Sequence, residues 1–166
     1  MIDEIFLKNI YEDSLEKELF SRDEKLILSF SGGPDSVFLL DFLLKFIPSE
    51  NLILIYFDHG LRDNDTLKLE RKFVLETGCK YSLKTLLKKI PVKKYSEKYR
   101  VSLETAGRNL RYILLCHYAK MFGVSKILTA HHLDDVCETF FLRAIRGSGT
   151  NLGSISDNMV SQTSSK

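Results

Sequence analysis

Residues 25–36, KLILSFSGGPDS, hold the stretch that decides the fold. A short apolar run that stops at glycines predicts a buried β-strand, and the apolar run at 37–46 predicts a helix packed against a sheet. Between them, two glycines let the backbone turn tightly and bring N–H groups close to an anion. Pro34 suits the first helical position, and the hydroxyls of Ser31 and Ser36 can donate to phosphate oxygens at the positive end of the helix. The stretch therefore predicts a phosphate-binding loop.

Two better-known phosphate loops do not fit this stretch. The G-x-x-x-x-G-K-[ST] loop needs a lysine that does not follow Gly32 and Gly33, and the spacing G-x-G-x-x-G is also missing. An acid inside a phosphate loop, Asp35, points to a divalent metal that bridges it to the phosphates. The alternative is that the two glycines merely connect a strand to a helix.

Strands alternate with helices along the chain. Expected strands span residues 25–30, 51–57, 80–83 and 126–130, and expected helices span 2–20, 37–46, 64–77, 103–122 and 134–146. The third helix is expected to stop at Gly78 and the fourth at Gly123. Continuous apolar strands between helices predict an α/β fold with a parallel sheet and helices on both faces. Right-handed crossovers then bring the loops that follow the strands to one edge, where such folds bind ligands.

Length and composition fit one globular domain. The 166 residues are 44% hydrophobic and 28% charged, and a net charge of +2 is too small to establish a nucleic-acid partner. Three scattered cysteines argue against a disulfide framework and a structural zinc site. Neither a signal peptide nor a membrane-spanning run is found, so we expect a cytoplasmic protein. We expect residues 1–153 to form the domain and the Ser-rich residues 154–166 to be a disordered or non-native tail.

Two polar segments accompany the second strand and the fourth helix. DHGLR at 58–62 follows the second strand, where a polar turn is the simpler interpretation. On the helix at 103–122, Glu104, Arg108 and Arg111 lie at i, i+4 and i+7 and so share one face. A solvated face with a salt bridge between Glu104 and Arg108 is the alternative there.

A third polar segment, TAHHLDDVCET at 129–139, follows the fourth strand. Its acids could simply cap a helix and satisfy the helix dipole. However, Asp135 and Glu138 are three residues apart and share a face beside His131 and His132. Carboxylates in this setting suit Mg²⁺, which keeps water ligands and takes one or two protein oxygens together with phosphates. The pattern H-H-x-D-D does not favour zinc.

The loop after the first strand resembles the Ser-Gly-Gly-x-Asp-Ser signature of the PP-loop ATP pyrophosphatases, the N-type family that cleaves ATP to AMP and pyrophosphate. From about residue 25 to 155, the chain resembles the tRNA(Ile)-lysidine synthetase branch of that family. The matching pieces are SFSGGPDS (29–36), DHGLR (58–62), E-x-x-x-R-N-x-R-Y (104–112), TAHHLDD-x-x-ET (129–139) and RGSG (146–149). The resemblance implies a Rossmann-like three-layer sandwich of the adenine-nucleotide α-hydrolase type.

The resemblance also implies an activity. Enzymes of this branch modify the wobble cytidine of the isoleucine tRNA that carries a CAU anticodon. ATP adenylates the C2 oxygen of the base and releases pyrophosphate, and the amine of free L-lysine then attacks C2 and expels AMP, which makes the enzyme a carbon–nitrogen ligase. Members of the family usually continue into further C-terminal regions that help to hold tRNA. We expect those regions to be absent here, so that the chain is a fragment, a truncated reading frame or a minimal enzyme. As a fragment it would be inactive toward tRNA on its own.

The same resemblance implies a role for each matching residue. The residues expected to bind ATP are Ser31, Gly32, Gly33, Pro34, Asp35, Ser36, His59 and Arg62. The residues expected to take part in catalysis are Asp35, Arg108, Arg111, His131, Asp135 and Glu138, with Asp35 and Asp135 linked to Mg²⁺. Arg108, with Arg111 as second choice, would face the α-phosphate or the departing AMP. His131 would assist adenylation or stabilise charge, and Glu138 would orient the lysine amine or a basic partner.

A basic stretch at residues 84–100 lies outside the expected ATP-binding and catalytic residues. It contains seven lysines and arginines against Glu97 alone, with Tyr95 and Tyr99 between them. Such a pattern fits tRNA contact, with the tyrosines stacking on unpaired bases, and fits a solvated amphipathic helix equally well. Four rival functions remain open at this point: a tRNA thiolase, a GMP or NAD synthetase, an ATP-binding module without chemistry, and a pure RNA-binding fragment.

Overall fold

The computed structural model describes residues 3–130 of the chain. Their centre is a four-stranded parallel sheet with the strand order β3-β2-β1-β4. The strands are β1 (Leu26–Ser29), β2 (Leu52–Asp58), β3 (Lys84–Lys89) and β4 (Lys126–Thr129). In register, Leu26 of β1 lies opposite Leu52 of β2 and Lys126 of β4. The parallel sheet that the apolar runs predict is therefore confirmed.

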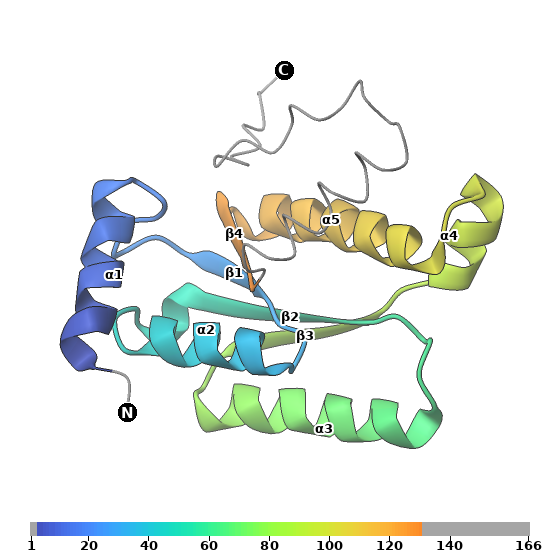
Figure 1. Cartoon of the computed structure of the whole chain (residues 1–166), viewed down its shortest axis with the longest axis horizontal. Coiled ribbons are helices and arrows are strands. Elements are labelled where there is room, and N and C mark those ends of the chain that lie inside the picture. Colours follow the sequence, from blue (N-terminus) through green and yellow to red (C-terminus); the bar gives the residue numbers. More distant parts are fainter. Residues whose placement is uncertain (1–2, 131–166) are drawn as a thin grey trace. The chain divides into compact units, whose positions relative to one another are not determined.

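Helices cover both faces of this sheet, as predicted (Figure 1). One face is covered by α1 (Glu4–Glu16), α2 (Pro34–Leu44) and α3 (Asn64–Lys80), and the other by α4 (Val92–Tyr99) and α5 (Leu103–Phe122). A short 3-10 helix, η1 (Ser49–Asn51), leads into β2. The described part of the chain thus has three layers, with the sheet in the middle.

Strand β2 shows why helices must cover both faces of the sheet. Leu52, Leu54 and Tyr56 belong to the apolar cluster beneath α1, α2 and α3, while the residues between them face α5. All seven residues of β2 are buried. Successive side chains of a strand point to opposite faces, so a strand that is apolar throughout must be buried on both sides.

The turn from α3 into β3 differs from the prediction. Helix α3 does not stop at Gly78 but continues to Lys80, and the chain then turns through Ser82, whose φ is +54°. Gly78 is required for packing, because a Cβ atom there would lie only 2.2 Å from the hydroxyl oxygen of Thr85 in β3. The strand expected at 80–83 is therefore wrong, since β3 begins at Lys84.

The end of α5 matches the prediction. The helix begins after Ser102, whose hydroxyl accepts a hydrogen bond from the Thr105 N–H, and it ends at Gly123 with a left-handed φ of +65°. The helix expected at 134–146 and the domain boundary expected at 153 lie outside the described residues. Within residues 3–130, no helix is long and apolar enough to cross a membrane.

Candidate functional site

The strand order makes β1 the topological switch point of the sheet. The chain moves from β1 to β2 and β3 on one side of the sheet, and later returns to add β4 on the other side of β1. Loops that leave neighbouring strands in opposite directions open a crevice at the carboxyl ends of those strands, which is where open α/β sheets bind ligands. The loop between β1 and α2 stands at this point. The predicted location of the phosphate loop therefore coincides with the topological switch of the sheet.

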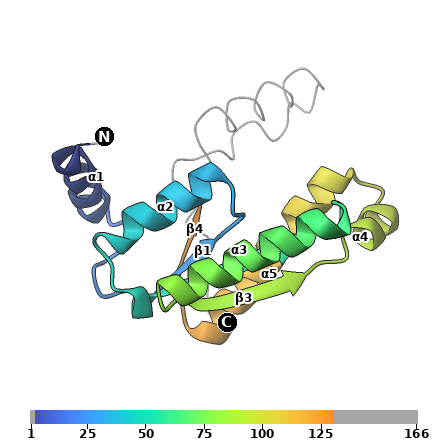
Figure 2. The same cartoon turned by 90° about the horizontal axis from the view of Figure 1, so that it is seen from below.

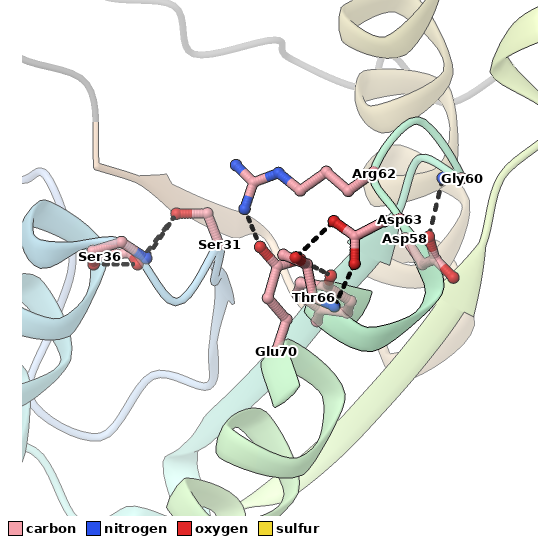
Figure 3. A network of polar contacts seen from close by, with 10 residues as sticks. Ser31, Ser36, Asp58, Gly60, Arg62, Asp63, Thr66 and Glu70 are labelled. Carbon is pink, nitrogen blue, oxygen red and sulfur yellow. Dashed lines mark hydrogen bonds and ion pairs between the residues drawn. The ribbon is translucent and has the colours of Figure 1, made fainter. Parts of the chain in front are cut away.

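Three hydrogen bonds hold the β1–α2 loop in shape (Figure 3). The Ser31 hydroxyl donates to the Ser36 hydroxyl at 3.1 Å, and the Ser36 hydroxyl donates to the Gly33 carbonyl at 2.8 Å. The Gly33 N–H completes the set by donating to the Ser31 oxygen at 3.3 Å. These bonds fix the shape of the loop, and Ser36 is only 2% exposed. That both hydroxyls bind phosphate remains a prediction.

The same loop leaves backbone donors without an acceptor. Gly32 has a left-handed φ of +78°, and Gly33 begins α2 without any side-chain cap. Within residues 3–130, the N–H groups of Gly32, Asp35 and Ser36 have no hydrogen-bond partner. Unsatisfied N–H groups at a helix N-terminus attract anions, because the helix dipole adds partial positive charge there. Pro34 occupies the first helical position as predicted, where its missing N–H costs nothing.

The β2–α3 loop is held in another way, by charged side chains. Asp58, at the end of β2, is 2% exposed and forms an ion pair with Arg71 of α3. Its other carboxylate oxygen accepts a hydrogen bond of 2.8 Å from the Gly60 N–H. Burial alone would raise the pKa of Asp58, but the hydrogen bonds from Arg71 and Gly60, together with the charges of Arg71 and Lys89, lower it below its usual value. Asp58 therefore stays ionised and fixes the turn.

Arg62 of the same loop is bound to α3. Its guanidinium pairs with Glu70, and the Tyr56 hydroxyl donates to the second oxygen of Glu70 at 2.7 Å (Figure 3). Burial and the negative charge of Asp58 raise the pKa of Tyr56, so this hydroxyl remains a donor. Arg62, expected at the nucleotide, is thus positioned by Glu70 at the edge of the loop.

His59 rests directly on α5. A Cβ atom at Gly107 would lie 2.7 Å from the His59 Nδ1 atom, so only glycine allows the helix and the imidazole to approach this closely. Burial, and then the positive charge of Arg111, lower the pKa of His59, which keeps the ring neutral near pH 7. Gly107 was not among the predicted site residues, although a glycine inside a helix costs about 1 kcal/mol relative to alanine and so calls for a packing reason.

The two arginines expected to face the α-phosphate differ in their surroundings. Arg108 is exposed, stacks over the Tyr112 ring at 5.9 Å, and forms no salt bridge with Glu104. Arg111 is half-buried, and no carboxylate in the described part of the chain pairs with it. Burial and the charge of Arg108 lower the pKa of Arg111. A half-buried cation that has no anionic partner among the described residues can bind an anion.

Several predicted site residues lie outside the described residues. These are His131, His132, Asp135 and Glu138, together with the RGSG motif. In residues 3–130, no group of three or more His, Cys, Asp or Glu side chains is arranged to hold a metal ion. Asp35 is exposed at the second position of α2 and forms no ion pair or hydrogen bond with another described side chain. Its carboxylate is therefore available as one hard oxygen ligand.

The fold, the loop at the switch point and the unpaired cation define a class of nucleotide-binding domain. The profile of the PP-loop domain family matches residues 3–165, and the chain belongs to this family. The U34-tRNA thiolase NcsA from Methanococcus maripaludis, solved with its [4Fe-4S] cluster, has the same fold, with a TM-score of 0.63 and 19% identity. The likeness covers 87% of this chain and 52% of the thiolase.

More specific relatives are found among curated proteins. The chain is 37% identical over 134 residues to the tRNA(Ile)-lysidine synthase of Dehalococcoides mccartyi, which covers 80% of this chain and 28% of that protein. It is 34% identical over 154 residues to the tRNA(Ile)-lysidine synthase of Petrotoga mobilis, which covers 90% of this chain and 48% of that protein. The chain thus spans less than half the length of either synthase.

Proposed function

We propose that this chain carries the ATP-dependent chemistry that joins lysine to C2 of the wobble cytidine in the CAU anticodon of isoleucine tRNA. The observation that carries the proposal is the set of unpartnered N–H donors in the β1–α2 loop at the switch point of the sheet. The identity of 37% to a tRNA(Ile)-lysidine synthase supports the choice of substrate. A thiolase is less well supported, because the structural likeness to NcsA has an identity of 19%.

The β1–α2 loop would bind the pyrophosphate part of ATP through its backbone. The N–H groups of Gly32, Asp35 and Ser36 would donate to phosphate oxygens, while the Ser31 and Ser36 hydroxyls keep the loop in shape. Arg111 would neutralise charge that develops at the α-phosphate, since it is half-buried and has no partner in the described residues. Neutral His59 and Arg62 would border the nucleotide.

Asp35, and Asp135 from the segment after β4, would hold Mg²⁺. The metal, when bound, supplies neutralisation of phosphate charge and polarises the α-phosphate. The fit rests on the free carboxylate of Asp35 next to a phosphate loop, a position in which an acid would otherwise repel the ligand. His131 and Glu138 would assist adenylation and orient the lysine amine, respectively.

The reaction would proceed in two steps, adenylation of the base and attack by lysine. The C2 oxygen of cytidine attacks the α-phosphorus of ATP, a new O–P bond forms, and the P–O bond to pyrophosphate breaks. The lysine amine then forms a bond to C2, loses a proton, and AMP leaves with the former C2 oxygen. The protein's part is to align the reacting atoms, to stabilise charge at the phosphorus and to keep water away from the activated base.

The test is the release of pyrophosphate from ATP and Mg²⁺ by the 166-residue chain, with and without unmodified CAU-anticodon isoleucine tRNA and lysine. We expect release to require the tRNA and to fall by about 100-fold or more in Asp35→Ala. Asp65→Ala is the matched control, because Asp65 is also an exposed aspartate at the second position of a helix, α3. Equal effects of the two substitutions, or release that ignores the tRNA, would contradict the proposal. Measurable ATP binding without any release would leave a nucleotide-binding module instead.

A further inference from the structure

A basic segment, residues 84–100, comprises β3, α4 and Arg100. Its seven cations are all exposed: Lys84, Lys88, Lys89, Lys93, Lys94, Lys98 and Arg100. Glu97 is the one acid in the segment. Removing these seven cations and one acid from the chain's 24 and 22 leaves 17 against 21, so the rest of the protein has a net charge of −4. The positive charge of the chain is therefore concentrated in this segment.

The cations of the basic segment are not neutralised by nearby acids. None of the seven forms an ion pair within residues 3–130. Helix α3 is different, because its Lys68, Arg71 and Lys72 each pair with a carboxylate. An ordinary solvated helix gains stability from such pairs, whereas unpaired like charges repel one another. This pattern in the basic segment indicates a polyanionic partner and argues against a merely solvated face.

Strand β3 carries three of these cations, and the last of them, Lys89, lies beside the β2–α3 loop. Lys84 and Lys88 point to the α5 face of β3, with their ammonium groups 3.9 Å from the Phe122 ring centre and 5.9 Å from that of Tyr118. Lys89 points to the opposite face, where its Cε atom would lie 3.6 Å from a Cβ atom at Gly60. Figure 2 shows β3 at the edge of the sheet and α4 following at its end. Lys89 is therefore the cation of β3 that reaches the β2–α3 loop.

Two aromatic rings lie among the cations. Tyr95 and Tyr99 have ring centres 4.4 Å apart, and the Lys98 ammonium is 5.1 Å from the centre of the Tyr99 ring. Tyr99 is 53% exposed, so much of its ring is open to solvent. An exposed aromatic ring beside cations is suited to stacking on an unpaired base of a nucleic acid. An acidic protein partner has no such base, so the rings favour RNA.

We propose that the basic segment binds the phosphate backbone of an RNA loop, with Tyr99 stacking on an unpaired base and Lys89 directing the strand toward the β2–α3 loop. The identity of the RNA rests on the proposed function, but the binding itself does not. The exposed cations of α3 serve as the internal comparison, since they lie on the neighbouring helix and are mostly paired.

The test uses fluorescence anisotropy of the full 166-residue chain with two labelled RNAs, a CAU anticodon stem-loop and a hairpin of equal size with another loop. The variant Lys93→Ala/Lys94→Ala/Lys98→Ala is compared with Lys68→Ala/Lys72→Ala/Lys80→Ala, which removes the same charge from α3. We expect the first variant to lose about tenfold or more in affinity and to reduce the slope of log affinity against log salt by about 2. The second should change affinity by less than about threefold. Equal losses in both variants, or no RNA binding by the unaltered chain, would overturn the proposal.

A further variant separates charge from folding. Arg100 caps α4 in the left-handed region with φ +52°, a conformation that glycine adopts without strain. Arg100→Gly should therefore raise or maintain the melting temperature while it weakens RNA binding by about twofold or more. Unchanged binding in this variant would count against the proposal. If the charge variants behave as expected but pyrophosphate release never depends on tRNA, the proposed function fails and RNA binding by the basic segment stands. If release depends on tRNA but the charge variants bind RNA as the unaltered chain does, only the inference about the basic segment is overturned.

Discussion

The β1–α2 loop and the β2–α3 loop leave neighbouring strands at the same edge of the sheet, yet they use their polar groups in different ways. The first loop is held by its own hydroxyls, and its Gly32, Asp35 and Ser36 N–H groups remain without acceptors in the described residues. The second uses charged side chains, Asp58 with Arg71 and Arg62 with Glu70, to fix its path. The first is therefore organised to receive a ligand, and the second to position the residues around it.

The largest effect is expected from two matched glycine substitutions, one in each loop. Gly32 has φ +78° and Gly60 has φ +63°, and a Cβ atom at either position would meet its nearest neighbour at 3.5 Å or 3.6 Å. Gly32→Ala and Gly60→Ala should each cost about 1–2 kcal/mol of stability from backbone strain. Only Gly32→Ala should also lower ATP affinity by about tenfold or more, because the phosphate donors move. Calorimetric titration with ATP measures the affinity of each variant. Equal ATP affinities of Gly32→Ala and Gly60→Ala would show that the two loops do not differ in ligand binding.

The second prediction concerns the ion pair beneath the β2–α3 loop. Asp58→Asn keeps the shape of the side chain but removes its charge, so the hydrogen bond from Arg71 weakens. We expect the free energy of unfolding to fall by about 1–3 kcal/mol, measured by urea denaturation. ATP affinity of the folded protein should change by less than about threefold. A large loss of affinity without any loss of stability would place Asp58 in the ligand site.

The pH dependence of that effect sharpens the comparison. Because the pKa of Asp58 is lowered on folding, its contribution to stability is present above the unfolded pKa, near 4, and is lost as pH falls through the lower folded pKa. The difference in unfolding free energy between the unaltered protein and Asp58→Asn should thus be full at pH 7 and should shrink below about pH 4. A difference that stays constant from pH 7 to pH 3 would show that the charge of Asp58 is not what stabilises the loop.

The smallest effect is expected at His59. Burial lowers the pKa of His59 first, and the positive charges of Arg111 and Arg62 lower it further. Arg111→Ala should therefore raise the pKa of His59, and Arg62→Ala should raise it by less. An NMR titration of the His59 ring protons measures both shifts, and Lys120→Ala on the same helix serves as the control. If Arg111→Ala leaves the pKa of His59 unchanged, the charge of Arg111 does not act on the imidazole.

Sequence reasoning succeeded where the signal is local. Apolar runs and the glycines after β1 predicted the parallel sheet, the helices on its two faces and the loop between β1 and α2. It failed at residues 80–83, because Gly78 serves a contact with Thr85 and not a helix end. The pair of Asp58 with Arg71 and the approach of His59 to Gly107 also escaped prediction. These contacts join residues that are distant in sequence, and only the folded chain brings them together.

The strand order of the sheet was likewise not predicted, although it locates the site. The hydrophobic pattern of β4 is the same whether it joins the sheet beside β3 or beside β1. The pairing with β1 creates the switch point, at which the β1–α2 loop lies. The choice between Arg108 and Arg111 was also undecided by spacing, because only the packing of α5 makes one of them half-buried.

The central claim is that this chain transfers AMP from ATP to RNA at the β1–α2 loop. The most direct measurement incubates the chain with ATP labelled at the α-phosphate, Mg²⁺ and unmodified CAU-anticodon isoleucine tRNA, without lysine. We predict that the label appears on the tRNA and leaves as AMP once lysine is added, and that Gly32→Ala slows the transfer when ATP is below saturation. ATP consumption without label on the RNA, or labelling that is unaffected by Gly32→Ala, would contradict the account.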